Sequence, residues 1–290
     1  MKRADPYLHA CLQGEDVIRA RGISAFPVEP TDIARELDIE VVAKPAGEGV
    51  SGMLLRVGNS YGIVYAPRID NPGFERFSIA HELGHYFLPG HIDAVLGDSD
   101  VHVSHAGFGS SDRYELEADH FAAALLMPRQ MFSAALRRAG DGIAAIEQLA
   151  RICKTSLTAT AIRYAQCSSD PVAIVVSTGG SIDYCFMSDA LRDHDGIDWI
   201  HKRQAVPLAT PTFAFNSNPD NVQRAERVED ESDLQTWFGG SRRIKLREDV
   251  IGLGRHQKIL TMLHGIELPE DEDEDADEAL IESWTPSFRR

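Results

Sequence analysis

The sequence has few cysteines, no long apolar run and no excess of positive charge. Its four cysteines (Cys11, Cys153, Cys167 and Cys185) are scattered and form no CxxC pair, which argues against a disulfide framework and favours a reducing compartment. The first residues, MKRADPYLHACLQGED, lack the apolar core of a signal peptide. No segment approaches the roughly 20 apolar residues that a membrane-spanning helix needs. We therefore expect a cytoplasmic protein with no membrane partner.

Positive charge is scarce relative to negative charge. The chain carries 29 Lys and Arg against 45 Asp and Glu, a formal net charge of −16. Ten of the acidic residues, and no Lys or Arg, lie between Glu267 and Glu282, so −16 + 10 leaves −6 for the rest. This balance excludes a broad basic surface, and direct nucleic-acid binding is not expected. Residues 267–290 are predicted to form a disordered acidic tail.

The hydrophobic pattern predicts a mixed α/β (α+β) protein. Strand-like segments lie at residues 39–42, 53–57 and 61–65, the last two joined by a three-residue loop, Gly58-Asn59-Ser60. The segment 52–57 could be an edge strand that pairs with a peptide substrate, or a plain structural strand. Predicted helices cover residues 31–37 (capped by Thr31 or Asp32), 72–88, 112–127, 143–153 and 156–165.

The character of the sequence changes at Ser168-Ser169-Asp170-Pro171. We therefore expect one domain at residues 1–168 and a second α/β domain, of unknown role, at residues 169–266. The tail follows at 267–290. Residues 143–165 resemble two short helices joined by a tight turn.

The strongest chemical signal is His81-Glu82-Leu83-Gly84-His85, which has the form HExxH. The surrounding segment is predicted to be a helix, with Asn71 as N-cap and Pro72 at its first position. Positions i and i+4 share a face of a helix, so His81 and His85 can bind one zinc ion from the same side. Glu82 can then reach a water molecule on that metal and act as general base.

A zinc site of this type needs a third protein ligand, and the sequence offers three candidates, of which Glu117 points about 200° away from Glu115 on the helical wheel. Glu115 lies 30 residues after His85 on the next predicted helix, and Asp119 follows it by one turn, where it could orient a zinc-bound histidine. Glu115 could instead be the N3 member of a capping box with Asp112. His91 matches the third histidine of the metzincin pattern, although that pattern's glycine is replaced by Leu88. Glu115 ranks first and His91 second.

Several side chains could stabilise an oxyanion in such a site, and nothing in the sequence selects among them. They are Tyr86, His91, His102, His105 and His120.

Two segments together resemble the ImmA/IrrE family of metallopeptidases. They are Arg76-Phe-Ser-Ile-Ala-His-Glu-Leu-Gly-His and Glu115-Leu-Glu-Ala-Asp-His-Phe-Ala-Ala-Ala-Leu-Leu-Met-Pro128. The resemblance covers roughly residues 15–165 and implies a compact, zincin-like metallopeptidase domain. It implies zinc as the cofactor, His81, His85 and Glu115 as its ligands, and Glu82 as the catalytic base.

The resemblance also implies a regulatory role. Family members typically cut a helix-turn-helix repressor and thereby release its target genes, sometimes as a stress response. This chain departs from the simplest members because about 120 residues follow the peptidase-like segment. Some relatives carry a helix-turn-helix unit and a sensor-like domain after the peptidase, so the resemblance implies a sensor-like role for residues 169–266. Residues 143–165 could be the helix-turn-helix unit, with a thin basic surface of Arg151, Lys154 and Arg163, or two helices that complete the first domain. Two alternatives stay open: a non-catalytic sensor or binding module stabilised by metal, and a metzincin-like peptidase that uses His91.

Overall fold

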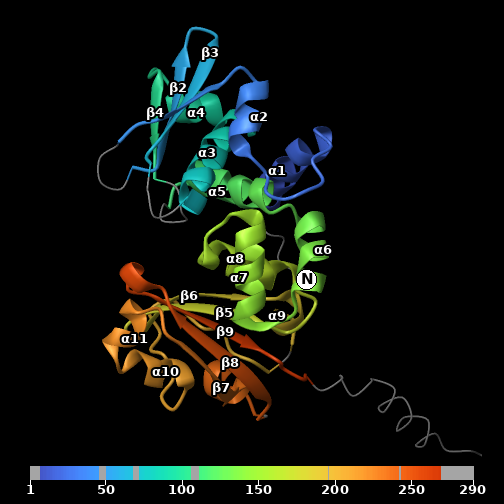
Figure 1. Ribbon diagram of the computed structural model, residues 1–290, viewed down its shortest axis with the longest axis vertical. Helices are drawn as coiled ribbons and strands as arrows, with labels where there is room; N and C mark the ends of the chain where they lie inside the picture. The colour runs from blue at the N-terminus through green and yellow to red at the C-terminus, as the bar shows by residue number, and fades with distance from the viewer. Residues whose placement is uncertain are drawn as a thin grey trace, which may run out of the picture. The chain divides into compact units, whose positions relative to one another are not determined.

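The computed structural model describes residues 7–45, 50–67, 72–105, 111–194, 196–241 and 243–268 (Figure 1). The chain forms two compact units, residues 1–168 and 169–290. Each unit combines helices with one small β-sheet, so the predicted mixed α/β class is confirmed. Among the described helices, none has the length and apolar character needed to cross a membrane. The four cysteines are free thiols.

The first unit contains eight described helices, and most follow the predicted segments. They are α1 (Leu8–Ala20), α2 (Pro30–Glu36), α3 (Pro72–Phe87), α4 (His91–Leu96), α5 (Arg113–Leu126), α6 (Arg129–Ala139), α7 (Gly142–Cys153) and α8 (Leu157–Cys167). The predicted caps of α2 are wrong, because Pro30 occupies its first turn and Glu29 is the N-cap. Proline suits this position since its fixed φ matches the helix and its missing N–H is not needed there. The predicted N-cap of α3, Asn71, lies outside the described residues.

The sheet of the first unit has the strand order β1-β3-β2-β4. Its strands are β1 (Glu40–Ala43), β2 (Gly52–Val57), β3 (Ser60–Tyr65) and β4 (Val101–Ser104). Val57 pairs with Ser60, so the β2–β3 loop has two residues and not the predicted three. Gly58 has a φ of +62°, which tight hairpin turns of this length require. Of the two alternatives for residues 52–57, the structure has the plain structural strand and not the edge strand, because β2 lies between β3 and β4.

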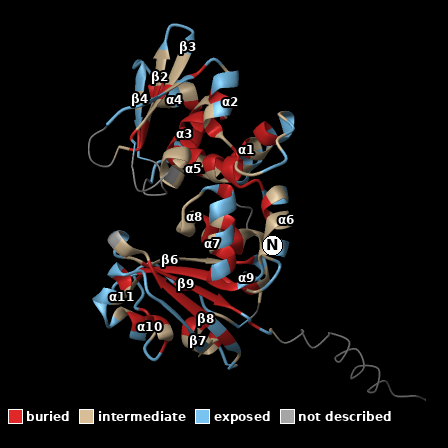
Figure 2. Cartoon of the chain, in the orientation of Figure 1, coloured by how far each residue is buried: buried red, intermediate tan, exposed pale blue. Residues whose placement is uncertain are grey.

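Helices α3 and α5 form the centre of the first unit, and in Figure 2 both are buried over most of their length. Helix α3 ends before Pro89-Gly90, and α5 begins at Asp112, whose Oδ1 accepts a hydrogen bond from the Tyr114 N–H. A Cβ atom at Gly84 would lie 3.1 Å from the Ala118 Cα. The two helices therefore approach closely because residue 84 has no side chain, and this contact brings their polar residues together.

Helices α7 and α8 are joined by a tight turn in which Lys154 adopts the left-handed conformation. The connectivity matches the helix-turn-helix alternative, but the expected basic surface is incomplete. Arg163 is buried, donates to the Met127 carbonyl oxygen and pairs with Glu15 at 3.0 Å. The Arg163 guanidinium therefore binds groups of the first unit and is not exposed for binding to DNA phosphates.

The second unit contains a five-stranded antiparallel sheet with the order β6-β5-β9-β8-β7. The strands are β5 (Ala173–Thr178), β6 (Ser181–Met187), β7 (Arg227–Asp233), β8 (Lys245–Gly252) and β9 (Ile259–His264). Short helices connect them: α9 (Asp189–Arg192), α10 (Pro211–Asn216), α11 (Pro219–Gln223), α12 (Leu234–Phe238) and the 3-10 helix Gly254–His256. Residues 269–290, most of the predicted acidic tail, lie outside the described part of the chain.

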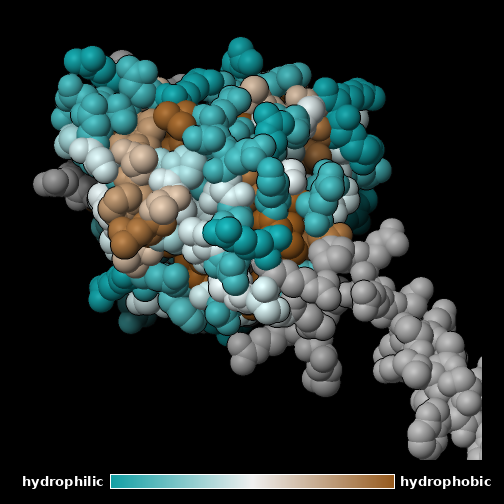
Figure 3. Space-filling model, turned by 90° about the horizontal axis from the view of Figure 1, so that it is seen from below, coloured by the Kyte–Doolittle hydropathy of each residue, from teal (hydrophilic) through white to brown (hydrophobic). Residues whose placement is uncertain are grey.

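The core of the second unit is largely apolar, and the carboxylates of Glu248 and Asp249 are buried within the unit. Trp237, Phe238 and Leu263 are among its fully buried residues, while Glu248 accepts hydrogen bonds from the Trp237 indole and from Thr212. The face drawn in Figure 3 is mostly hydrophilic, with apolar side chains gathered in small patches. Such patches are normal for a folded protein.

Candidate metal centre

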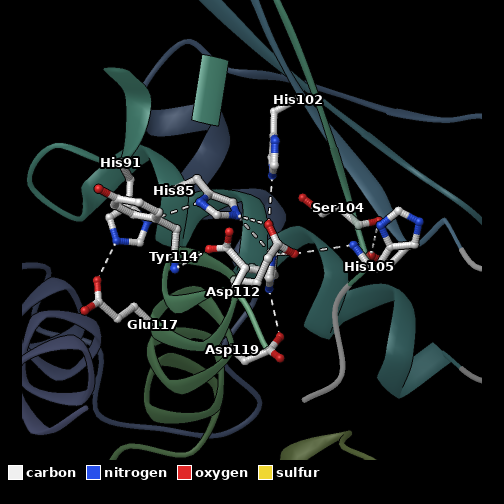
Figure 4. A network of polar contacts seen from close by, with 12 residues as sticks. His85, His91, His102, Ser104, His105, Asp112, Tyr114, Glu117 and Asp119 are labelled. Atoms are coloured by element: carbon white, nitrogen blue, oxygen red, sulfur yellow. Dashed lines mark hydrogen bonds and ion pairs between the residues drawn. The ribbon is translucent and has the colours of Figure 1, made fainter. Parts of the chain in front are cut away.

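The candidate site lies where helices α3 and α5 meet strand β4. Helix α3 supplies His81, Glu82 and His85, and α5 supplies Glu115 and Asp119. All five side chains are buried or nearly so. The histidines share a face of α3 because they are four residues apart. Figure 4 shows the polar network around them, with His102 on one side and Asp119 on the other.

The potential ligand atoms of His81, His85 and Glu115 all lie within 4.8 Å of one another. The Nε2 atoms of the two histidines are 3.1 Å apart. Glu115 Oε1 lies 3.3 Å from His85 Nε2, and its Oε2 lies 3.5 Å from His81 Nε2. Zinc–ligand bonds of about 2.0–2.2 Å in a tetrahedron give ligand–ligand separations of about 3.3–3.5 Å. The observed spacing therefore fits an ion of this size.

Hydrogen bonds on the far side of each ring turn the free nitrogens towards this centre. His81 Nδ1 lies 2.8 Å from Asp119 Oδ1. Because an ionised carboxylate can only accept, the proton of a neutral His81 ring is on Nδ1 and its Nε2 is a bare lone pair. The position of Asp119 matches the predicted orienting carboxylate.

The same logic applies to His85 through His91. His91 Nε2 lies 2.9 Å from Glu117 Oε2, so this nitrogen carries the proton of the neutral His91 ring. His91 Nδ1 is then an acceptor, and His85 Nδ1, 3.1 Å away, donates to it. His85 Nε2 is therefore also a bare lone pair. Two imidazole lone pairs and one carboxylate face a common point, and only a cation makes that arrangement favourable.

If no metal ion is bound, a proton takes its place. Burial alone would lower the pKa of His81, but hydrogen bonds to Asp119 and Glu115 and the charge of Glu82 raise it to about 10. Burial lowers the pKa of His85 to about 3, with the positive charge of His81 acting in the same direction. The pKa of Glu115 is held far below its ordinary value, because its histidine partners outweigh the opposing effect of burial. The centre thus attracts one positive charge.

Glu82 is completely buried beside this centre. Neither of its carboxylate oxygens has a hydrogen-bond partner of good geometry among the described residues, although the Ser104 hydroxyl lies near enough to lower its pKa. Burial raises its pKa to about 7, although the charge of His81 acts in the opposite direction. A Cβ atom at Gly52 would lie only 2.6 Å from Glu82 Oε1, so the glycine leaves space for the carboxylate. An unpartnered carboxylate with this pKa can both take up and release a proton near neutral pH.

His91, the alternative ligand, lies behind His85 and not among the clustered ligand atoms. Both of its ring nitrogens are engaged, one with His85 and the other with Glu117. Glu117 also pairs with Arg113 at 2.6 Å. The geometry therefore favours Glu115 over His91 as the third ligand, and it places His91 away from the point where an oxyanion would form.

The capping-box alternative for Glu115 does not describe its contacts. Its carboxylate faces the histidines of the centre, and His102 Nε2 lies 2.9 Å from Oε1. His102 was only one of several possible donors in the sequence, and its contact with Glu115 was not predicted. The signal that could have found it is alternation in residues 101–104, which turns His102 and Ser104 to the same face of a strand.

The other possible oxyanion donors lie in different surroundings. The ring of His120 stacks on Tyr7 with its centroid 4.4 Å away, and Tyr86 packs edge-on against Tyr61. The His105 backbone N–H approaches Glu115 Oε2 at 3.5 Å. Of this group, His102 and His105 therefore lie beside the candidate centre.

Comparison with known proteins agrees with this geometry. Residues 34–164 match the family model described as the IrrE N-terminal-like domain. The radiation response metalloprotease IrrE of Deinococcus radiodurans is 32% identical over 104 residues, which are 36% of this chain and 30% of that protein. Its counterpart in Deinococcus deserti is 33% identical over 105 residues, 36% of each chain. The match thus spans about a third of the length of these curated relatives.

A solved structure shares the fold. The Mycobacterium tuberculosis transcriptional regulator superposes with a TM-score of 0.56 at 14% identity, covering 88% of this chain and 75% of that one. At this identity the likeness concerns the fold alone. The residues matched by the family model, 34–164, lie within the unit that contains His81, Glu82 and His85. Residues 34–164 of this chain are thus similar to the IrrE N-terminal-like domain, in agreement with the resemblance of the sequence to the ImmA/IrrE metallopeptidases.

Proposed function

We propose that this chain is a zinc-dependent endopeptidase that cleaves a specific regulatory protein, a helix-turn-helix transcriptional repressor, in the cytoplasm. The observation that carries the catalytic part is the convergence of three bare ligand atoms, from His81, His85 and Glu115, beside the unpartnered carboxylate of Glu82. The repressor as substrate rests on the family resemblance. The IrrE relatives named as radiation response metalloproteases support a role in regulation.

His81, His85 and Glu115 would hold the zinc ion, which supplies a Lewis acid and a water molecule of lowered pKa. Glu82 accepts a proton at its carboxylate and returns it to the nitrogen of the leaving amine. Asp119 fixes the ring orientation of His81, and His91 does so for His85. A purely structural site needs no such base, so the buried, unpartnered Glu82 favours catalysis over the sensor alternative.

The edge strand β4 offers a place for the substrate backbone. Arg56 N–H donates to the Asp100 carbonyl oxygen, and the register then turns the backbone groups of His102 and Ser104 towards β2. The N–H and C=O of Val103 consequently face the open edge. An extended peptide segment paired there would run past Glu82 and Glu115 and add a strand to the sheet.

The test combines metal analysis with cleavage. The wild-type protein should retain about one zinc per chain after dialysis and cut a helix-turn-helix repressor encoded beside its gene, as seen by mass spectrometry. Glu82→Gln should keep the zinc and the fold but lower the cleavage rate by about 10²–10⁴-fold. The matched control is Glu36→Gln, an exposed glutamate on α2, which should behave as the wild type. Full proteolysis by Glu82→Gln would refute the assigned base.

A further inference from the structure

A cavity of about 290 Å³ adjoins the candidate metal centre on the side of Glu115. Helix α4 contributes Ala94 and Val95 to its wall, β4 contributes Val103, and the first turn of α5 contributes Tyr114. The volume is about twice that of the ~150 Å³ engineered cavity that holds a benzene ring. The cavity can therefore accommodate a large side chain directly beside the reacting centre.

Of the four polar residues in the wall, the side chains of His102, Asp112 and Glu115 already have partners within the protein, and His105 approaches Glu115 through its backbone N–H. His102 Nε2 lies 2.9 Å from Glu115 Oε1, and Asp112 Oδ1 accepts from the Tyr114 N–H at 2.7 Å. Glu115 itself faces the histidines of the metal centre. A polar group entering the cavity would therefore have to compete for these groups, and burying it without a partner is costly.

The remaining walls are apolar and partly open to solvent. Val103 is 41% exposed and Tyr114 is 38% exposed, both among the large apolar side chains with substantial exposure. Ala94 is also exposed. Covering these groups with an apolar side chain removes apolar surface from water on both partners.

We propose that this cavity is the specificity pocket of the peptidase and that it receives a large apolar side chain, such as Leu, Met or Phe, next to the scissile bond. The proposal rests on the proposed function, because it deepens the description of the same site. Val103, whose backbone groups face the open edge of β4, also lines the cavity. A substrate paired along this edge therefore places one of its side chains into the pocket.

The first test is cleavage of a peptide mixture randomised around the scissile bond. We expect at least a tenfold preference for Leu, Met or Phe over Ala or Asp at one position. Full burial of the three additional carbons of Leu relative to Ala corresponds to up to about 60-fold. Ala94→Trp should fill the pocket and shift the preference to small residues. The matched control is Ala43→Trp, also an exposed alanine, on the opposite edge strand β1.

The second test measures ligand binding to the pocket in the absence of peptide cleavage. Hydroxamates that bind zinc and carry a methyl, isobutyl or benzyl group on either side of the metal are titrated onto the zinc-loaded Glu82→Gln variant. We expect the isobutyl or benzyl compound of one series to bind at least tenfold more tightly than the methyl compound, and Ala94→Trp in this background to abolish the difference.

The outcomes separate the two proposals. Zinc-dependent cleavage without any side-chain preference, or a preference that Ala94→Trp leaves unchanged, would overturn the pocket assignment and leave the peptidase function standing. Selective hydroxamate binding without cleavage of any peptide or repressor would support the pocket and overturn the peptidase function.

Discussion

The affinity of the proposed zinc site should rise steeply with pH, because zinc has to displace a proton from His81. Hydrogen bonds to Asp119 and Glu115 raise the pKa of this histidine to about 10, although burial alone would lower it. A protonated nitrogen cannot bind a metal ion. Between pH 8 and 9.5 His81 is mostly protonated in the metal-free protein, whereas Glu82, with a pKa of about 7, is already ionised.

The size of the effect follows from proton counting. One proton released per zinc makes the dissociation constant fall tenfold per pH unit, so about 30-fold between pH 8 and 9.5, or roughly 2 kcal/mol. Burial lowers the pKa of His85 to about 3, so His85 adds nothing in this range. The folding stability of the metal-free protein should change with pH in the opposite direction, falling as the pH rises. The stability contributed by the His81 proton is fully present below about pH 6.5 and is lost as the pH rises through about 10.

The assay is a competition titration with a chromophoric chelator at several pH values, corrected for the chelator's own protonation. Calorimetry in two buffers of different ionisation enthalpy counts the protons released. A zinc-bound water can release a further proton, so a variant has to isolate the share of His81. Asp119→Asn keeps a hydrogen-bond acceptor but removes the charge that holds the His81 proton.

In Asp119→Asn the proton release at pH 9 should fall and the pH dependence should flatten. Zinc and the proton compete for the same nitrogen and are both favoured by the carboxylate, so the variant should lose more zinc affinity at pH 10 than at pH 8. An affinity that is constant between pH 8 and 9.5, or equal proton release by the wild type and the variant, would refute the reasoning.

Three further substitutions test the ligand set and the position of the base. Glu115→Ala should retain no zinc after dialysis, whereas His91→Ala should retain it with about 10–100-fold lower affinity, because His91 only orients His85; the reverse ranking by elemental analysis would identify His91 as the ligand. Gly52→Ala should keep zinc but lower the cleavage rate by up to about 100-fold, because its Cβ would displace the Glu82 carboxylate. An unchanged rate would show that Glu82 tolerates the shift.

Local signals in the sequence were sufficient to predict the helix that bears the HExxH motif. The spacing of His81 and His85 fixes a shared helical face, and Pro89-Gly90 ends α3 after Phe87. Asp112 caps α5 as its residue type predicts. The resemblance of the two segments to a metallopeptidase family was also correct. Each of these inferences depends on residues within a few positions of one another.

Local signals failed where a choice depended on neighbours in space. The sequence could not show that β4 would pair with β2, and residues 52–57 were therefore not recognised as a central strand. Nor could it show that Pro30 would begin α2 ahead of both proposed caps. Pairing between strands 45 or more residues apart is decided by the packing of the whole unit, because several pairings satisfy the same alternation of side chains.

The sequence by itself determined which residues can bind a metal ion and where the helix that presents two of them begins and ends. Only the tertiary structure shows which candidate for the third ligand lies beside His81 and His85. The close approach of α3 and α5 at Gly84 and Ala118 brings Glu115 to the two histidines, while His91 is held behind His85 by Glu117. The physical reason is that spacing along a helix is fixed by backbone geometry. The distance between two helices depends instead on the side chains, or the single hydrogen of a glycine, that separate them.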